Sequence, residues 1–311
     1  MAARRVERDS GWFATLKRTA TEFRDDNLSD WAAALTYYGL LSLFPALIAL
    51  VSLIGLVGDP EETTKTLTEI VAAIGPESAI ETFSGPIESL ASNRSAAGFA
   101  LVLGLAVALW SASGYVGAFM RASNVIYETP EGRPFWKLRP LQLLVTLVMV
   151  LLTAIVALGL VLTGPIVEAV AEPIGLSDTA VTVWDIAKWP VLVALVIVMI
   201  GLLYYASPNV RLRGFKWVTP GSIVAVVVWA LASAAFAFYV ANFGSYDQTY
   251  GTLGGLVAVL VWMWITNLAL LFGVELNAER ERDRELDAGV PRAEREIQLE
   301  PRDEPKEQRT T

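Results

Sequence analysis

Six long stretches without Asp, Glu, Lys or Arg recur along the chain, and polar segments separate them. They cover residues 33–57, 97–120, 140–163, 189–206, 220–242 and 254–274. Each has about the ~20 residues that a helix needs to cross the hydrocarbon core of a bilayer. A bilayer accepts only helices or closed barrels, and the alternation typical of barrel strands is absent. The pattern therefore predicts an all-α integral membrane bundle of six transmembrane helices, the last running to about residue 276.

Basic residues are distributed unequally among the segments that connect these stretches. Segments 1–32, 121–139 and 207–219 hold thirteen Lys and Arg residues. Segments 58–96, 164–188 and 243–253 hold only three, together with twelve acidic residues. Basic residues accumulate on the cytoplasmic side of membrane proteins. We therefore expect a multi-pass protein of the cell membrane with both termini in the cytoplasm.

The polar flanks of the bundle define the domain organisation. Residues 1–30 are expected to form a cytoplasmic amphipathic segment, in which Trp12 and Phe13 alternate with Lys17 and Arg18, lying flat on the inner leaflet. Residues 31–277 form the transmembrane domain. Residues 278–311 are charged and are expected to be a disordered cytoplasmic tail. Apolar residues at helical spacing within 58–96 predict short amphipathic helices in the outer loops.

Composition excludes several kinds of chemistry. The chain has no Cys and no His, which rules out thiol catalysis, imidazole general bases and zinc sites that need imidazole. We therefore expect no metal site, no cofactor and no enzymatic activity. The net charge is −8, and Arg outnumbers Lys threefold. An acid-rich exterior of this kind favours a halophilic archaeon as the source, while a GC-rich genome is the alternative explanation.

Three segments of the sequence carry a family resemblance. They are AAALTYYGLLSLFPALIALVSLIGL, MRASNVIYETPEGRPFWKLRPLQLL and the region from PGSIVAVVVWALASAAF to LLFGVELNAE. They resemble the YihY/BrkB family of membrane proteins, whose members were formerly labelled ribonuclease BN. Gly273-Val274-Glu275-Leu276-Asn277 stands where the family has G-A-E-L-N. The resemblance implies six membrane helices and a transporter or lipid exporter. A non-transporting scaffold of the cell envelope is the alternative.

The ribonuclease label conflicts with the chemistry of the chain. RNA hydrolysis of the metal-dependent kind draws on clusters of His and carboxylate side chains. This chain has no His, and Glu275 is the one acid within a predicted membrane helix. The basic loops are already explained by membrane orientation. We therefore expect no nucleic-acid partner.

Charged residues at the inner ends of the helices are the candidate binding residues. Glu275 is costly in a membrane helix unless it is paired or functional, and Arg121 is its expected partner. Arginine forks donate two parallel hydrogen bonds to phosphate. The candidate head-group site, for an anionic lipid or a polyprenyl phosphate, comprises Arg121, Asn124, Arg133, Arg139 and Glu275. Membrane orientation alone would also place these basic residues there, and Glu275 could instead be purely structural.

Polar and small residues inside the helices raise two further expectations. Pro45 removes a backbone donor, so we expect a kink that leaves the carbonyl of Leu41 to be bonded by Ser42. Glycines such as Gly114 and Gly255 are expected to permit close helix approach. A polar cavity between membrane helices one, two, five and six is expected from a set of polar side chains: Tyr37, Tyr38, Ser42, Tyr239, Asn242 and Asn267.

Overall fold

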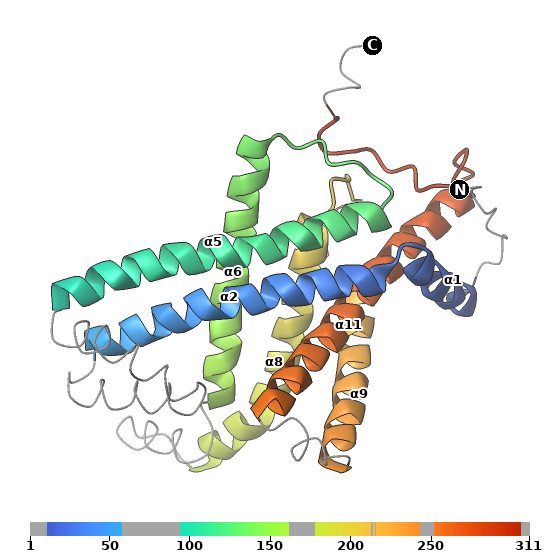
Figure 1. Cartoon of the computed structure of the whole chain (residues 1–311). Coiled ribbons are helices and arrows are strands. Elements are labelled where there is room, and N and C mark those ends of the chain that lie inside the picture. Colours follow the sequence, from blue (N-terminus) through green and yellow to red (C-terminus); the bar gives the residue numbers. More distant parts are fainter. Residues whose placement is uncertain are drawn as a thin grey trace. The chain divides into compact units, whose positions relative to one another are not determined.

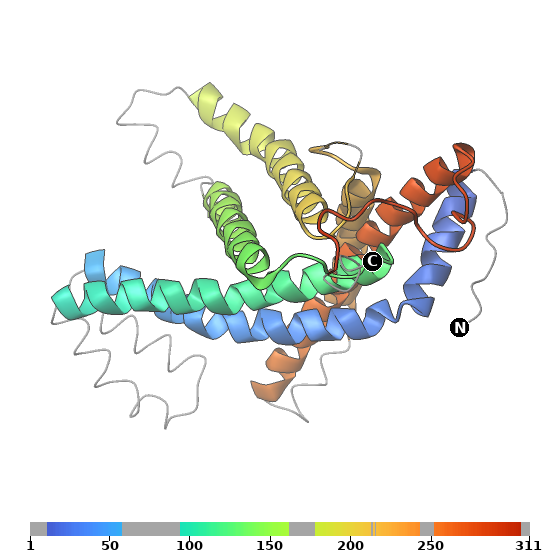
Figure 2. The same cartoon turned by 90° about the horizontal axis from the view of Figure 1, so that it is seen from above.

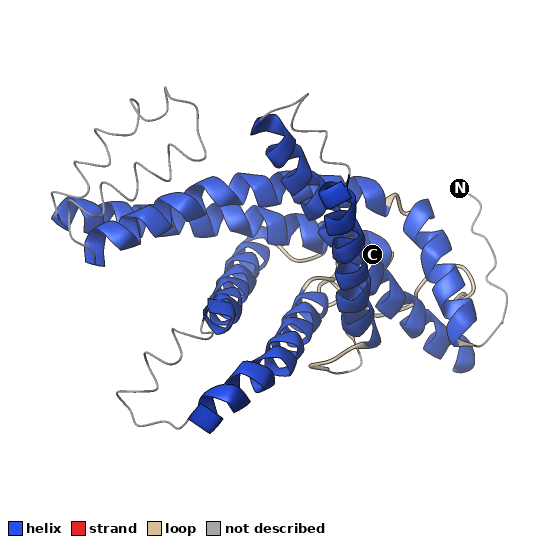
Figure 3. Ribbon diagram, turned by 90° about the horizontal axis from the view of Figure 1, so that it is seen from below, coloured by secondary structure: helices blue, strands red, loops and turns tan. Residues whose placement is uncertain are grey.

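The computed structural model describes residues 11–57, 94–161, 178–212, 214, 216–242 and 252–305, and within them the regular structure is helical (Figures 1 and 3). One isolated antiparallel bridge joins Val210 to Pro301. The helices in these ranges are α1 (Trp12–Asp25), α2 (Leu28–Val57), α5 (Arg94–Ile126), α6 (Phe135–Val161), α8 (Asp178–Ala206), α9 (Pro220–Asn242) and α11 (Thr252–Asp287).

The long helices coincide with the predicted apolar stretches. Five of them are long and apolar enough to cross a membrane: α5, α6, α8, α9 and α11. The remaining predicted stretch, 33–57, is the first in the sequence and lies within α2. The side chains of residues 43–57 are outside the described residues. The all-helical class is thus confirmed for the described residues, and five of the predicted stretches are helices long and apolar enough to span a membrane. The sixth span and the cytoplasmic position of the termini stay predictions, and the expected helices of the 58–96 loop lie outside the described residues.

Two compact units divide the chain, residues 37–115 and the remainder. In the first, the arms of α2 and α5 lie side by side (Figures 1 and 2). The Tyr38 ring lies 3.4 Å from where a Cβ on Gly114 would be. The hydroxyl of Ser111 donates to the carbonyl oxygen of Leu41 at 3.3 Å. Ser42 bonds Gly39 instead, so α5, not Ser42, satisfies the carbonyl that the proline leaves free.

Pro45 itself lies within α2, which continues to Val57. Its side chain falls outside the described residues, so the predicted kink stays a prediction. A proline inside a helix leaves one carbonyl, four residues earlier, without its amide donor. A serine from the neighbouring helix supplies that donor here.

Helix α11 is the axis of the other unit. It packs along α9 and carries α1 against its C-terminal part (Figure 1). Its 36 residues span about 54 Å at 1.5 Å per residue, well beyond the ~30 Å hydrocarbon core. The pairs Arg282–Glu279 and Arg284–Glu281, each three residues apart, support the helix past the predicted end at 276. The last turns of α11 therefore project from the membrane.

Helix α1 lies within residues 1–30, the segment predicted to be amphipathic. Its buried residues are Thr15 and Thr19, and the hydroxyl of Thr15 donates to Asp283 of α11 at 2.7 Å. The rings of Phe23 and Phe272 lie 5.9 Å apart. Phe13 is 82% exposed, so an apolar side chain remains on the outer face of α1. The structure thus docks α1 on α11, and its position on the inner leaflet stays a prediction.

The segment expected to be disordered, 278–311, differs from that expectation as far as residue 305. Residues 278–287 are the last turns of α11, and residues 288–305 fold back along the ends of the helices. The amide of Ile297 donates to Glu128 at 2.7 Å and the amide of Gln298 to Glu285 at 2.9 Å. Glu285 is buried and Glu128 is exposed, and through these two carboxylates the segment is bonded to the ends of the helices. Residues 306–311 lie outside the described residues.

Candidate functional site

The family-like segment Gly273–Asn277 forms the crossing of α11 with α9. A Cβ on Gly273 would lie 2.5 Å from the carbonyl oxygen of Gly221 and 2.9 Å from the Cβ of Ala225. Asn277 accepts from the amide of Gly221 at 2.9 Å and donates to Thr219 at 3.0 Å. Glycines at both positions therefore let two backbones touch, while Asn277 ties the start of α9 to α11.

The start of α9 is fixed by its own sequence as well. The amide of Thr219 donates to the Ser222 hydroxyl at 3.0 Å, and the amide of Ser222 donates to the Thr219 hydroxyl at 3.1 Å. Pro220 follows as the first helical residue, where its missing amide costs nothing. This reciprocal cap positions the polar loop before α9 beside α11.

A hollow opens where the end of α8, the start of α9 and the projecting part of α11 meet. Its lining is tyrosine-rich and cationic, and comprises Tyr127, Gly201, Tyr204, Tyr205, Leu212, Gly214, Lys216, Thr219, Pro220, Asn277, Arg280, Glu281 and Arg284. Arg284 forms an ion pair with Glu281. Lys216 and Arg280 add two positive charges that Glu281 does not balance. The hollow is therefore suited to an anionic group.

A second cluster, the carboxyl cluster, lies between α1, α11 and the turn after α5. It comprises Glu22, Asp26, Glu128, Glu275 and Glu279. Two arginines form ion pairs with carboxylates of this cluster. Arg18 donates to Glu279 at 3.0 Å, and Arg282 donates to Glu279 at 2.9 Å and to Glu128 at 3.1 Å. Both arginines are thus bound to Glu279, Glu128 or Asp283.

Glu275 is only 2% exposed, and its Oε2 has no hydrogen-bond partner. The charges that act on it most strongly are those of Asp26, Glu279, Glu22 and Arg282. Arg121, the expected partner, is exposed. The coupling of Glu275 with Arg121 stays a prediction, while Arg282 is the basic residue among these neighbours.

Asp26 and Glu22 lie outside the membrane-spanning helices, and burial and neighbouring carboxylates raise the pKa of both. Burial raises the pKa of Asp26 to about 7, and the charges of Glu22 and Glu128 add to that rise. Burial likewise raises the pKa of Glu22, against the lowering effect of Arg282. These two carboxyls hold protons more readily than exposed ones.

The raised pKa of Asp26 makes the free energy of unfolding depend on pH between about 4 and 7. The folded pKa of Asp26 is about 7 and its ordinary value is 3.8, so the folded state binds the proton more tightly. The resulting stabilisation is full below about pH 4 and is lost as pH rises through about 7. We expect the thermal midpoint of the detergent-solubilised protein to fall as pH rises from about 4 to about 7, and Asp26→Asn to flatten that fall. An unchanged slope in Asp26→Asn would contradict this assignment.

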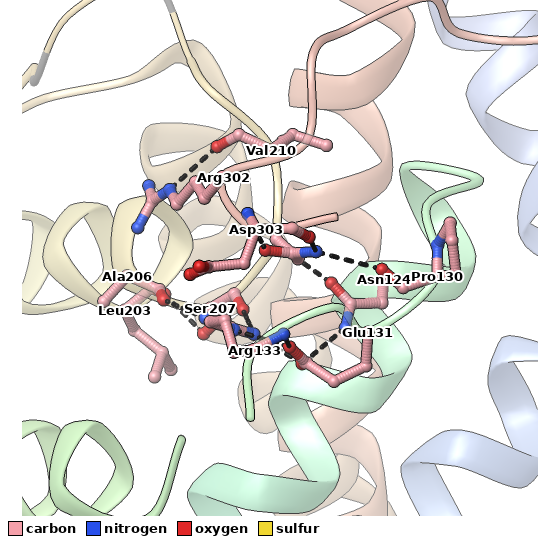
Figure 4. Close-up of polar contacts among 11 residues, drawn as sticks. Asn124, Pro130, Glu131, Arg133, Leu203, Ala206, Ser207, Val210, Arg302 and Asp303 are labelled. Atoms are coloured by element: carbon pink, nitrogen blue, oxygen red, sulfur yellow. Dashed lines mark hydrogen bonds and ion pairs between the residues drawn. The ribbon is translucent and has the colours of Figure 1, made fainter. Parts of the chain in front are cut away.

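The loop between α5 and α6 forms a third set of contacts, the loop network (Figure 4). Arg133 donates to both oxygens of Glu131 at 2.7 Å, and its NH2 also donates to the carbonyl oxygen of Ser207 at 2.9 Å. Asn124 donates to Glu131 at 2.9 Å. Burial would raise the pKa of Glu131, but the hydrogen bonds and charge of Arg133 lower it overall. Arg133 thereby holds the C-terminal end of α8 to the loop.

The folded-back segment 288–305 completes the loop network. Asn209 donates to the carbonyl oxygens of Pro130 and Asp303, at 3.0 and 2.9 Å. Arg302 donates to the carbonyl oxygen of Val210 at 2.8 Å (Figure 4). It also donates to the carbonyl oxygen of Tyr205 at 2.6 Å. The segment is thus attached to the loop that leads from α8 toward α9.

The candidate head-group residues are not gathered at one place. Arg133 and Asn124 are buried in the loop network, where their hydrogen-bonding groups are engaged. Arg139 donates to Gln142 at 3.2 Å and lies over the Phe135 ring. None of Arg121, Arg133 and Arg139 is among the described residues that line the hollow. Lys216 and Arg280, which do line it, were not predicted as binding residues, because they are far apart in the sequence and their proximity is not visible there.

The polar cavity candidates occupy different environments. Asn267 is buried and donates to Thr36 at 3.1 Å. Tyr239 is exposed, and Asn242 donates to the carbonyl oxygen of Phe238 in its own helix at 2.8 Å. Tyr37 is exposed, and its ring contacts that of Tyr38. Ser42 bonds Gly39. The expected cavity among helices one, two, five and six stays a prediction.

The described residues thus define a multi-pass helical membrane protein with a cationic hollow and a buried carboxyl cluster at one end of the bundle. In the described ranges no three His, Cys, Asp or Glu side chains are grouped to hold a metal ion. The family described as virulence factor BrkB matches residues 19–297. The chain belongs to this family.

Relatives of the chain include proteins named as membrane proteins and one named as ribonuclease-like. The ribonuclease-like protein YfkH of Bacillus subtilis is 32% identical over 82% of this chain and 90% of its own length. A UPF0761 membrane protein of Aeromonas salmonicida is 24% identical over 88% of this chain and 90% of its own length. Another from Chromohalobacter salexigens is 26% identical over 88% of this chain and 66% of its own length. No solved structure matches the chain.

Proposed function

We propose that this protein is a transporter of the cell membrane that moves an amphiphile with an anionic head group. The observation that carries the proposal is the cationic hollow at the end of the bundle. Lys216, Arg280 and Arg284 line it, and Glu281 offsets one of these charges. Arginine and lysine are the side chains best suited to a phosphate. A phospholipid or polyprenyl phosphate fits this chemistry.

The aromatic lining supports a ligand that is part polar and part apolar. Tyr127 and Tyr205 present rings with a hydroxyl at one end, a combination favoured where water meets lipid. Tyr204 donates its hydroxyl to the carbonyl oxygen of Leu270 at 2.6 Å, which holds this wall to α11. The Arg280 guanidinium lies 5.3 Å from the centre of the Trp12 ring, which orients it from α1.

The head-group residues proposed from sequence take two roles in this account. Arg133 and Asn124 hold the loop that borders the end of α8, as their contacts support. Arg121 and Arg139 are proposed to meet lipid head groups at the surface of the bundle, on the cytoplasmic side that the basic loops predict. Glu275 affects the hollow through Tyr127, which lines the hollow and interacts electrostatically with Glu275.

Movement of an anionic lipid between leaflets tests the proposal. The purified protein is reconstituted in phosphatidylcholine vesicles that contain a fluorescent phosphatidylglycerol, and a membrane-impermeant reductant bleaches the outer label. We expect the protein to carry inner label outward, and Lys216→Gln/Arg280→Gln to slow this by about tenfold or more. A hydrogen bond to a charged group contributes about 1.5–3 kcal/mol, and 1.4 kcal/mol is tenfold.

Arg211→Gln is the matched control, because Arg211 is in the same loop as Lys216, is 64% exposed at its side chain and is not among the residues lining the hollow. It should transport at the wild-type rate. A membrane scaffold without transport, the alternative function, predicts label movement no faster than in protein-free vesicles. That outcome would reject the transporter.

A further inference from the structure

The carboxyl cluster holds more negative charge than its arginines neutralise. Glu279 and Glu128 are bound to Arg18 and Arg282, as described above. In the part of the chain that the structure describes, no cation is in ion-pair contact with Glu22, Asp26 or Glu275. Three acidic groups that share one poorly solvated region cannot all be ionised at ordinary cost.

Glu275 is the group that points to a ligand in this region. It is almost fully buried, and its Oε2 accepts no hydrogen bond within the described structure. An ionised carboxylate without donors at a buried position is among the costliest arrangements in a protein. A proton on this oxygen removes the charge, and a carboxylic acid needs fewer partners than a carboxylate. No other small cation is favoured by the geometry, since no metal-holding group of three carboxylates exists among the described residues.

The charged and titratable groups around Glu275 come from three elements. They are Arg18, Glu22, Asp25 and Asp26 of α1 and its end, Tyr127 and Glu128 after α5, and Glu279 and Arg282 of α11. Asp26 and Glu22 lie toward solvent from Glu275, and burial raises the pKa of Asp26 to about 7. A half-buried carboxyl that exchanges its proton near neutral pH gives the buried one a route to water.

We propose that Glu275 is a proton-binding site, loaded and emptied through Asp26 and Glu22. The proton comes from water and returns to it, and no other bond changes. Tyr127 links Glu275 to the hollow, because it lines the hollow and interacts electrostatically with Glu275. Whether Glu275 carries a proton thus sets the charge beside the proposed head-group site. In this respect the inference rests on the proposed function and names the proton as its coupling ion.

Infrared spectroscopy of the purified full-length protein tests proton binding without any transport. A protonated carboxyl absorbs separately from a carboxylate. We expect a protonated-carboxyl band at neutral pH in the wild type, a smaller band in Glu275→Gln, where Asp26 still binds part of a proton, and a band of wild-type size in Glu300→Gln. Glu300 is a fair control because its side chain is 79% exposed. Raising Na⁺ at constant pH and ionic strength should leave the band unchanged.

Several outcomes would overturn the proposal. They are a wild type without the band, a folded Glu275→Gln whose band is as large as that of the wild type, and a band that Na⁺ removes, which would show a cation site. Should Glu275→Gln fail to fold, Asp26→Asn decides. Loss of this negative neighbour should move the titration of the remaining band to lower pH, and an unmoved titration rejects the site. A failed transport assay with these results intact would reject the transporter and not the proton site.

Discussion

Gly273→Ala is expected to separate α9 from α11 and to destabilise the protein by about 3 kcal/mol or more, at the upper end of overpacking costs. The added Cβ would lie 2.5 Å from the carbonyl oxygen of Gly221 and 2.9 Å from the Cβ of Ala225. Neither atom is the end of a flexible side chain, so a whole helix must move. The thermal midpoint in detergent should fall by several degrees.

Gly255→Ala is the matched control for that variant because it places the same methyl group on the same helix. A Cβ on Gly255 would have nothing within 4 Å in the described structure. Alanine is also the better helix former, by about 1 kcal/mol. Gly255→Ala should therefore melt at the wild-type temperature or slightly above it. Equal melting of Gly255→Ala and Gly273→Ala would contradict the close crossing.

Arg133→Gln is expected to cost about 3–5 kcal/mol, the range for breaking a buried ion pair by removing one partner. Glu131 would lose both bonds at 2.7 Å, and the carbonyl of Ser207 would lose its donor. The Asn124 side chain and the backbone amide of residue 133 would still donate to Glu131, but neither carries the positive charge that balances it. The loop between α5 and α6 should detach from the end of α8, which a lower thermal midpoint and faster proteolysis of the loop would record.

Arg211→Gln serves as the control here too. Its pair with Glu300 spans 3.4 Å between two mostly exposed side chains, and exposed pairs contribute about 0–1 kcal/mol. A loss in Arg133→Gln no larger than in Arg211→Gln would show that Arg133 is free for another role, including the head-group contact that the sequence suggests.

Helix length and polarity were sufficient to predict the spans. Uncharged stretches of about 20 residues predicted five helices that are long and apolar enough to cross a membrane, because a bilayer selects strongly for such stretches. The same reasoning placed the end of the last helix at 276, whereas α11 reaches Asp287. Beyond the bilayer, pairs such as Arg282–Glu279 sustain a helix that hydropathy does not detect.

Sequence reasoning identified polar residues but not what they contact. The Arg133 guanidinium is suited to binding phosphate. In the structure, however, it donates its hydrogen bonds to Glu131, two residues earlier, and to the carbonyl oxygen of Ser207. Residues 288–305 have the composition of a solvated tail, yet Arg302 and Asp303 hold it to the loop after α8. These contacts join residues about 90 apart, and composition carries no information on such pairs.

The segment Gly273–Asn277 shows what a short motif can and cannot reveal. Its resemblance to the family pattern marked Glu275, but Gly273 and Asn277 were not assigned roles. The structure shows that Gly273 permits the backbone crossing and Asn277 ties down the start of α9. Both roles depend on Gly221, which is 52 residues before Gly273 in the sequence. Glycines in a helix are therefore informative only once their neighbours are known.

The central claim is that the hollow lined by Tyr127, Lys216 and Arg280 seats an anionic head group. An experimental density map of the protein, purified with its native lipids, tests this most directly. The account predicts phosphate density within hydrogen-bonding distance of Lys216 and Arg280, and its loss in the Lys216→Gln/Arg280→Gln variant. Lipid density confined to the outside of the helices, with the hollow filled by side chains or water in both proteins, would contradict it.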